Sequence, residues 1–174
     1  MLDGLGRPPP LPYIAAVLRH PPRQPTSVLL CSQGGTRVAL PLEPVREVMR
    51  PLAVQPLAGA PTAVRGMAVV RGESVPVVDL GALLHGALAR TKTHSRWVRL
   101  DFGTRRIVLA VDAVLDVRTL SAEALHDAPP LLGEIGDALA LRVGTRDRAL
   151  LLLLGQSHVV PDATLTALDA ALPA

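Results

Sequence analysis

The same pattern of arginine, apolar and acidic positions occurs twice in this chain, at 37–48 and at 106–117. The shared order is Arg, apolar, any residue, Leu, any residue, apolar, acid, any residue, Val, any residue, acid, Val. A glycine suited to a turn, Gly34 or Gly103, precedes each copy by three residues. Two similar hairpins predict two similar small β-subdomains.

From residue 26 onward, short apolar segments alternate with turn residues, which is typical of a mainly β protein. Gly34-Gly35 has the composition of a tight hairpin turn. The tract 86–95 is polar and predicts a loop. We expect strands at 27–32, 37–40, 64–70, 74–78, 96–102, 106–111, 114–119, 138–143 and 149–154.

Two short helices are predicted by residues that can cap them. The carboxylate of Asp79 can accept free N–H groups in the first turn of a helix at 80–84. Ser121 can serve a helix at 122–125 in the same way. Both helices are expected to be brief interruptions of the β structure.

Two further helical segments are predicted by pattern. The segment 43–49 reads as one or two helical turns, with Pro44 tolerated near the start. The last helix follows Pro161 and Asp162, a typical start signal. Its leucines recur at helical spacing and form one stripe: Leu165, Leu168 and Leu172.

Residues 1–25 form a separate region that holds 7 of the 17 prolines. Proline at this density favours extended, polyproline-like chain. We therefore expect a proline-rich N-terminal extension at 1–25 and one domain at 26–174. The extension is either a flexible tail or a docking peptide or flap, and the sequence leaves both open.

The composition places the chain among cytoplasmic globular proteins. It is 49% hydrophobic but only 2% aromatic, so a core must be built from Val, Leu and Ala. Cys31 is the single cysteine, which rules out an internal disulfide and fits a reducing compartment. The apolar run 149–154 is too short to cross a bilayer, which needs roughly 20 residues. We expect no signal peptide and no direct membrane insertion.

The residues that catalysis would need do not converge. Five histidines are scattered without metal-ligand spacing, and Cys31 lies within a predicted strand. Asp112 and Asp116 could be an acid pair, but the repeat places Glu43 and Glu47 at the same positions, which favours a structural role. The prediction is a protein with no catalytic residue, cofactor or metal.

Nucleic-acid binding is also not expected, although the net charge is +3 and the pI about 10.0. The densest basic stretch, 90–106, contains only Trp97 and Phe102 as aromatic platforms. Phe102 alternates with apolar neighbours and is expected in the core. The arginines of this stretch are interpreted as the outer face of two strands.

The segment 69–80 contains the most specific motif. Arg71-Gly72 is followed by three residues and then by Pro-Val-Val-Asp-Leu, at 76–80. Proline within a strand lacks a ladder donor and suits an edge strand or a bulge. We therefore expect a hairpin that presents Arg71 beside a sheet edge.

This motif resembles the central motif of the CheW-like family of bacterial chemotaxis adaptors. The family has an Asn-Leu-Arg-Gly turn, where this chain has Val69 and Val70 before Arg71-Gly72. The segment 111–117 is similar to a second family pattern, Val-Asp-x-Val-x-Asp-Val. The resemblance covers roughly 27–154. It implies two SH3-like five-stranded β-barrels packed together, with short helices and a C-terminal helix.

The resemblance also implies a function without chemistry. CheW-like adaptors couple methyl-accepting chemoreceptors, through the receptors' cytoplasmic tip, to the regulatory domain of the histidine kinase CheA. The expected location is therefore the cytoplasm, at membrane-associated chemoreceptor arrays. An adaptor of a parallel system, such as twitching motility, and a scaffold detached from any kinase remain open.

The candidate protein-binding residues follow from the same resemblance. Arg71 matches the family's motif arginine, and Gly72 forms the turn with it; an internal salt bridge of Arg71 is the competing interpretation. A short family helix near the partner surfaces corresponds to Val45, Glu47 and Val48, although Val48 could instead be core. Gly66 matches a glycine where a partner helix would approach closely. Val69 replaces the usual Asn, so any contact of that amide is lost.

Overall fold

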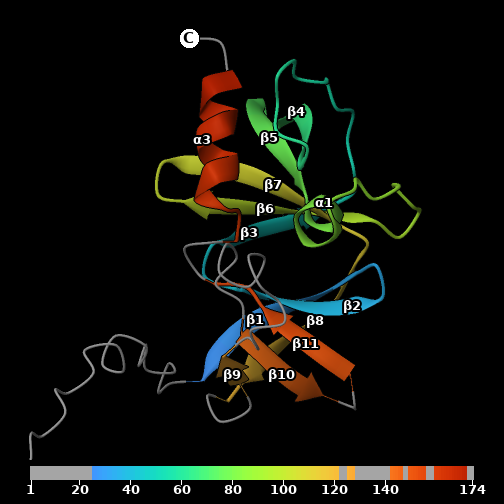
Figure 1. Ribbon diagram of the computed structural model, residues 1–174, viewed down its shortest axis with the longest axis vertical. Coiled ribbons are helices and arrows are strands. Elements are labelled where there is room, and N and C mark those ends of the chain that lie inside the picture. The colour runs from blue at the N-terminus through green and yellow to red at the C-terminus, as the bar shows by residue number, and fades with distance from the viewer. Residues whose placement is uncertain (1–24, 122–124, 128–141, 147–148, 156–158, 172–174) are drawn as a thin grey trace, which may run out of the picture.

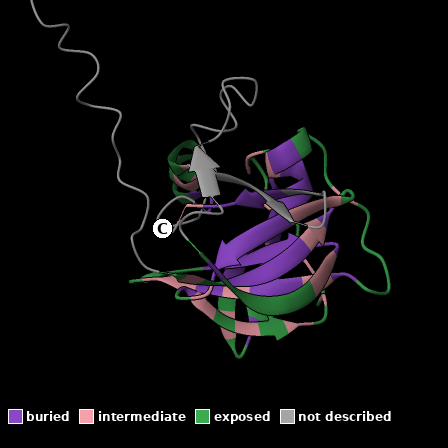
Figure 2. Ribbon diagram, turned by 90° about the horizontal axis from the view of Figure 1, so that it is seen from below, coloured by how far each residue is buried: buried purple, intermediate pink, exposed green. Residues whose placement is uncertain are grey.

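The computed structural model describes residues 25–121, 125–127, 142–146, 149–155 and 159–171. Two β-sheets lie one above the other along the long axis of the molecule (Figure 1). Buried residues are concentrated in the strands (Figure 2). The predicted mainly β fold with two small β-subdomains is confirmed.

The lower sheet in Figure 1 has six strands in the order β8-β1-β2-β11-β10-β9. Neighbouring strands are antiparallel except for β2 and β11, which are parallel. The strands are β1 (Thr26–Gln33), β2 (Thr36–Pro41), β8 (Ala113–Leu120), β9 (Leu125–Asp127), β10 (Arg142–Arg146) and β11 (Ala149–Leu153).

The upper sheet has five strands in the order β3-β6-β7-β5-β4. Beyond β3 the chain returns to the opposite edge, where Gln55 exchanges two 2.8 Å backbone hydrogen bonds with Met67 of β4. This bridge closes the sheet into a barrel-like unit. The strands are β3 (Val45–Met49), β4 (Val64–Val70), β5 (Glu73–Asp79), β6 (Arg96–Phe102) and β7 (Arg105–Val111).

The topology confirms the repeat seen in the sequence. In each sheet an antiparallel hairpin, β1–β2 or β6–β7, is followed by a strand that leaves for the other sheet. β3 follows β2 and pairs with β6, whereas β8 follows β7 and pairs with β1. The hairpins also gain equivalent parallel neighbours, β11 and β5. The two halves are thus related by duplication and exchange one edge strand each.

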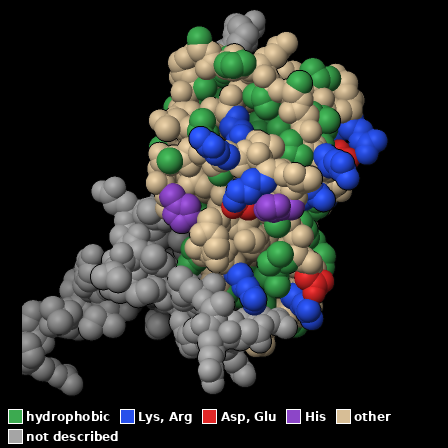
Figure 3. Space-filling view, turned by 90° about the vertical axis from the view of Figure 1, so that its right-hand side faces the viewer, with side chains coloured by type: hydrophobic (Ala, Val, Ile, Leu, Met, Phe, Trp, Pro, Cys, Tyr) green, Lys and Arg blue, Asp and Glu red, His purple; other side chains and the backbone are tan. Residues whose placement is uncertain are grey.

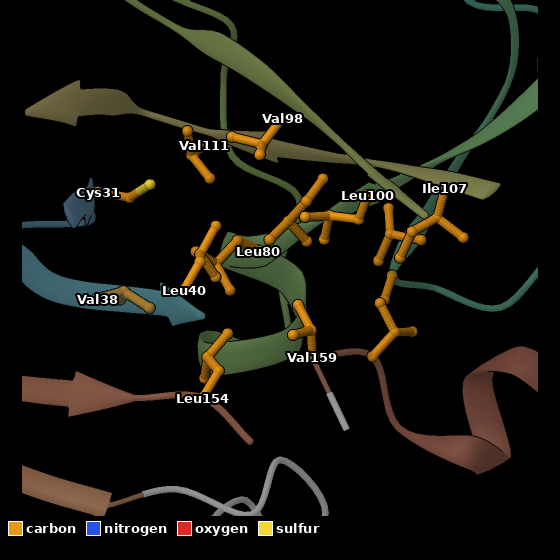
Figure 4. Close-up of a cluster of buried hydrophobic side chains, with 14 of the residues drawn as sticks. Cys31, Val38, Leu40, Leu80, Val98, Leu100, Ile107, Val111, Leu154 and Val159 are labelled. Carbon is orange, nitrogen blue, oxygen red and sulfur yellow. The ribbon is translucent and has the colours of Figure 1, made fainter. Parts of the chain in front are cut away.

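The largest core cluster lies between the two sheets. It takes alternate residues of β1, β2, β6 and β7 together with residues of two helices, α1 (Leu80–His85) and α3 (Asp162–Ala171). Leu40 of the lower sheet and Leu100 of the upper sheet meet Leu80 of α1 there (Figure 4). The other faces of these strands fill smaller clusters inside each sheet. Burial on both faces explains why these strands read as nearly continuous apolar runs.

Two local predictions were wrong. The segment 43–49 forms no helix, because Val45–Met49 is strand β3, which pairs with β6. Pro76 does not mark an edge, because β5 lies between β7 and β4. The alternative of a bulge agrees with the register shift in β4 between Val64 and Gly66, beside the Met67–Pro76 pair. Met67, opposite Pro76, directs both its backbone groups to Gln55, and the parallel ladder with β7 begins only at Val77. The proline therefore occupies a position where no ladder donor is required on either side.

The remaining local predictions have mixed outcomes. The strands of both hairpins, α1 and the start of α3 agree with expectation, while Leu125 begins β9 rather than ending a helix. The 122–124 and 138–141 segments lie outside the described residues, as do Leu172 and residues 1–24 of the N-terminal extension.

Candidate protein-binding site

Arg71 and Gly72 are the two central residues of the turn between β4 and β5. Both have positive φ, 55° and 82°, as the mirror-image hairpin turn requires. Glycine adopts this conformation freely, whereas for an arginine it is uncommon and costs about 1 kcal/mol. The Arg71 side chain at this turn is 73% exposed.

Arg71 pairs with Glu47, another of the predicted site residues. Its Nη2 lies 2.8 Å from Glu47 Oε2, and its Nε donates to the same oxygen at 3.2 Å. This forked geometry is a strong arrangement for a guanidinium and a carboxylate. The hydrogen bond from Arg71 is the main reason that the pKa of Glu47 is lowered and that the pKa of Arg71 is raised. The internal salt bridge considered for Arg71 is therefore present, with the arginine still largely exposed.

Arg99 on β6 extends this pair into a network. Its side chain is only 14% exposed and lies 3.6 Å from Glu47, 3.2 Å from Glu73 and 3.4 Å from Asp101. Two outer arginines complete the network, because Arg106 pairs with Glu73 and Arg46 pairs with Asp101.

The network lies at one end of the upper sheet's inner face. Trp97 and Arg99 point to the same side of β6, as do Val108 and Arg106 on β7. Trp97 and Val108 belong to the apolar cluster inside this sheet. The charged groups thus cover the open end of that cluster. The expectation that the arginines of 90–106 form an outer face is therefore wrong for Arg99, which shares the inner face of β6 with Trp97. Its alternation with Trp97 was a signal for this placement.

The three β3 residues singled out from the sequence have different environments. Val45 is partly buried against the central core, and Glu47 joins the ion-pair network. Val48 is 43% exposed, so the alternative that it belongs to the core is wrong. Strand alternation places Glu47 and Val48 on opposite faces of β3. Val45 and Glu47 differ although they are two residues apart, because the β3–β6 register shifts between them.

Glycine is required at position 66 because another segment of the same chain passes close to it. Its φ is 139°, and a Cβ there would lie 2.1 Å from the carbonyl oxygen of Gln55. The close approach expected of a partner helix is thus made by the segment that closes the barrel. The glycine permits the Gln55–Met67 bridge.

Asp79 of the motif has a structural role. It is fully buried, and its Oδ1 accepts from Ala82 N at 2.8 Å, which confirms the predicted helix cap. Its Oδ2 accepts from Arg65 Nε at 2.6 Å, and Arg65 also bonds Thr91 and the Ala89 carbonyl. Asp79 therefore anchors both α1 and the 86–95 loop. Arg65 was missed because its sequence surroundings give no sign of a distant carboxylate.

Exposed apolar side chains lie on an edge strand of each sheet. Val48 on β3 is 43% exposed, and Leu115 and Val117 on β8 are each 52% exposed. Val48 and Val117 are equivalent positions of the sequence repeat. Both are paired opposite residues of the central core cluster, Val98 and Leu29. Each half of the molecule therefore carries an apolar surface next to the junction between the sheets.

Reactive chemistry is not assembled in the described part of the chain. Cys31 is buried, and burial raises the pKa of its thiol to about 12, as expected for an inert cysteine. Within these ranges no group of His, Cys, Asp and Glu could hold a metal ion. Basic side chains on one face are separated by hydrophobic and neutral surface (Figure 3). Among the helices that the structure describes, none is long and apolar enough to span a membrane.

Comparison with known proteins gives consistent matches. The family model described as CheW-like domain matches residues 27–162. The chemotaxis protein CheW of Klebsiella aerogenes is 25% identical over 126 residues, which cover 72% of this chain and 76% of that protein. Protein FrzA of Myxococcus xanthus is 34% identical over 107 residues, covering 62% of this chain and 64% of FrzA.

A solved structure has the same fold. The scaffolding protein TtCheW from Thermoanaerobacter tengcongensis superimposes with a TM-score of 0.67 at 22% identity. The match covers 76% of this chain and 90% of that one.

Proposed function

Because this chain belongs to the CheW-like domain family, we propose that it couples methyl-accepting chemoreceptors to the regulatory domain of the histidine kinase CheA. Members of this family are scaffolds and adaptors that carry out no reaction. The observation that carries the proposal is the exposed Arg71–Glu47 pair, which joins two of the residues that match the family's partner-binding motifs.

An adaptor needs separate surfaces for its two partners. The exposed apolar residues of β3 and those of β8 meet this need, since they lie on different sheets at equivalent positions of the repeat. An apolar centre beside polar groups is the usual composition of a protein interface. We assign the β3 edge, with Glu47 and Val48 on its two faces and Arg71 beside it, to the receptor. We assign the surface of Leu115 and Val117 on β8 to the kinase.

The other candidate residues shape the receptor surface. Gly72 permits the turn that presents Arg71, and Val45 anchors β3 against the core. Gly66 keeps the closing segment against β4. Val69 is 66% exposed on β4, so this adaptor offers an apolar side chain where the family commonly has an amide. That difference favours a receptor with an apolar group at the matching position.

The working domain in this proposal is 26–174, and 1–25 is an accessory extension. The adaptor functions in the cytoplasm and reaches the membrane through its receptor. No nucleic acid, cofactor or metal takes part.

The decisive experiment separates partner contact from internal pairing. Arg71→Glu and Glu47→Arg, alone and combined, are titrated calorimetrically with the CheA regulatory domain and with a receptor tip fragment from the same genome. Each single variant places like charges together, so both are expected to lose some stability. The combined variant restores opposite charges at the same two positions.

We expect the combined variant to regain only part of the thermal stability, because the new pair is restored but Arg99 then faces an arginine at position 47. Its receptor-fragment affinity should remain at least about tenfold weaker than that of the original protein, because a partner carboxylate would meet Glu rather than Arg at position 71. CheA binding should stay within about twofold. Full recovery of receptor binding would assign Arg71 an internal role only. Absence of binding to any CheA would overturn the coupling function.

A CheW-like adaptor of a parallel pathway is the second candidate. Its support is that FrzA, a relative with a different name from CheW, shares 34% identity with this chain. Binding to one CheA-type kinase among those of the same genome would identify the pathway.

Deletion of the N-terminal extension tests whether the protein is an adaptor or a scaffold detached from any kinase. Deletion of residues 1–25 is expected to leave receptor and kinase affinities unchanged within about twofold, since the candidate surfaces lie in the described domain. Calorimetry on the shortened chain measures this. Loss of partner binding would instead make the proline-rich segment a ligand for another domain.

A further inference from the structure

A cavity of about 220 Å³ lies where α3 crosses the β6–β7 hairpin, away from the surfaces assigned above. Its walls come from three parts of the chain: the hairpin, the segment before α3, and α3 itself. The lining residues are Phe102, Thr104, Arg105, Ile107, Val159, Val160 and Leu165.

The cavity is open to solvent at its rim, and its wall is mainly apolar. Water against such a wall gains few hydrogen bonds, so an apolar group can displace it. Here five of the seven lining residues are apolar. Ile107, Val159 and Val160 are almost fully buried, so the inner wall is formed by the edge of the central core.

The rim of the cavity carries one cation. Arg105 is about half-exposed, and its Nη2 donates to Asp169 of α3 at 2.6 Å. A guanidinium has five N–H donors, so further donors remain for an oxygen-bearing ligand at the rim. Thr104 adds a hydroxyl group next to it.

We propose that this cavity binds a small amphiphilic carboxylate, with the apolar chain against the core edge and the carboxylate on Arg105. A void of about 150 Å³ lined by apolar side chains holds benzene, so a volume of about 220 Å³ fits a chain of roughly eight carbons. The charge of Arg105 selects an acid over an alcohol of the same length. The site is independent of the coupling function.

The relation between Asp169 and the ligand makes the proposal specific. Asp169 already offers a carboxylate to Arg105 from the surface of α3. A bound carboxylate competes with it for the same guanidinium. Removal of the Asp169 charge should therefore strengthen the binding of a carboxylate ligand. The binding of a purely apolar ligand should stay the same.

The test is calorimetric titration of the full chain with octanoate and with octan-1-ol. We expect octanoate to bind with a dissociation constant of roughly 0.1–1 mM, and octan-1-ol about tenfold more weakly. Arg105→Gln should weaken octanoate binding about tenfold and leave octan-1-ol binding unchanged. Asp169→Asn should tighten octanoate about threefold.

A matched control separates the site from general charge effects. Arg106→Gln changes the net charge equally at the neighbouring residue, which pairs with Glu73 on the other face of β7. Leu165→Trp should fill the cavity and abolish the binding of both octanoate and octan-1-ol. The proposal is overturned if octanoate does not bind, if octan-1-ol binds as well as octanoate, or if Arg106→Gln acts like Arg105→Gln.

Discussion

At the residue scale, glycine is needed at two positions of this chain for different physical reasons. Gly35 lies in an open turn with positive φ, where an added Cβ would meet nothing within 4 Å. Gly66 combines positive φ with a backbone approach that leaves no space for a side chain. The first needs glycine for conformation alone, and the second also needs it for volume.

This difference predicts the effects of alanine at the two sites. Gly66→Ala should lower the free energy of unfolding by about 3 kcal/mol, because the Gln55–Met67 bridge must open. Gly35→Ala, the matched control, should cost only about 1 kcal/mol of backbone strain. Urea denaturation of both variants measures the difference. Equal losses would contradict the steric role of Gly66.

At the element scale, β3 and β8 are the exchanged edge strands, and they share a position in the repeat. Each is held on one side by the hairpin of the sheet that it joins, β6–β7 for β3 and β1–β2 for β8. Each also leaves an apolar residue exposed, Val48 or Val117. Exposed apolar groups next to polar surface favour partner binding when they recur at equivalent sites.

Charged substitutions at these two positions should therefore separate the partners. Val48→Glu is expected to weaken binding of the receptor fragment by about tenfold and to change CheA binding little. Val117→Glu is expected to weaken CheA binding and to change receptor binding little. Both sites are about half-exposed, so the melting temperature should change little. Calorimetric titration of each variant with each partner measures these effects. If a substitution weakened binding of both partners equally, that result would argue against separate surfaces.

At the scale of the whole molecule, a buried polar joint ties the two halves together. Asp112 lies where the chain passes from β7 to β8, and it accepts a 3.0 Å hydrogen bond from Gly34 N in the β1–β2 turn. Its own N–H donates to the side chain of Gln33 at 3.1 Å. Lys92 of the 86–95 loop lies 3.5 Å away. Thus a turn, a loop and a strand junction from both sheets converge on one carboxylate.

Loss of this carboxylate should destabilise the entire fold. Asp112→Ala leaves the Gly34 N–H without its acceptor and is expected to cost about 2 kcal/mol. Asp116→Ala removes a half-exposed acid that pairs with Arg118 and should cost less than about 0.5 kcal/mol. Thermal and urea unfolding compare them. A similar cost for both would mean that the joint adds no stability.

The sequence by itself determined most strands, most turns and the duplication. These features depend on local chemistry: alternating or continuous apolar residues, glycine at positive φ, and the Asp79 carboxylate at the start of α1. The motif also identified Arg71 and Glu47 as candidates, although nothing in the sequence showed that they pair.

Only the tertiary structure decided how distant residues meet. Val45–Met49 is a strand because the hairpin β6–β7 offers it a partner, and that partner lies about 50 residues away in the chain. Gly66 is needed because Gln55 returns across the barrel, and Arg99 is a hub because the curved sheet brings Glu47 and Glu73 to it. Pairings of this kind depend on closure of the sheet, and residue patterns within a single segment carry no information about it.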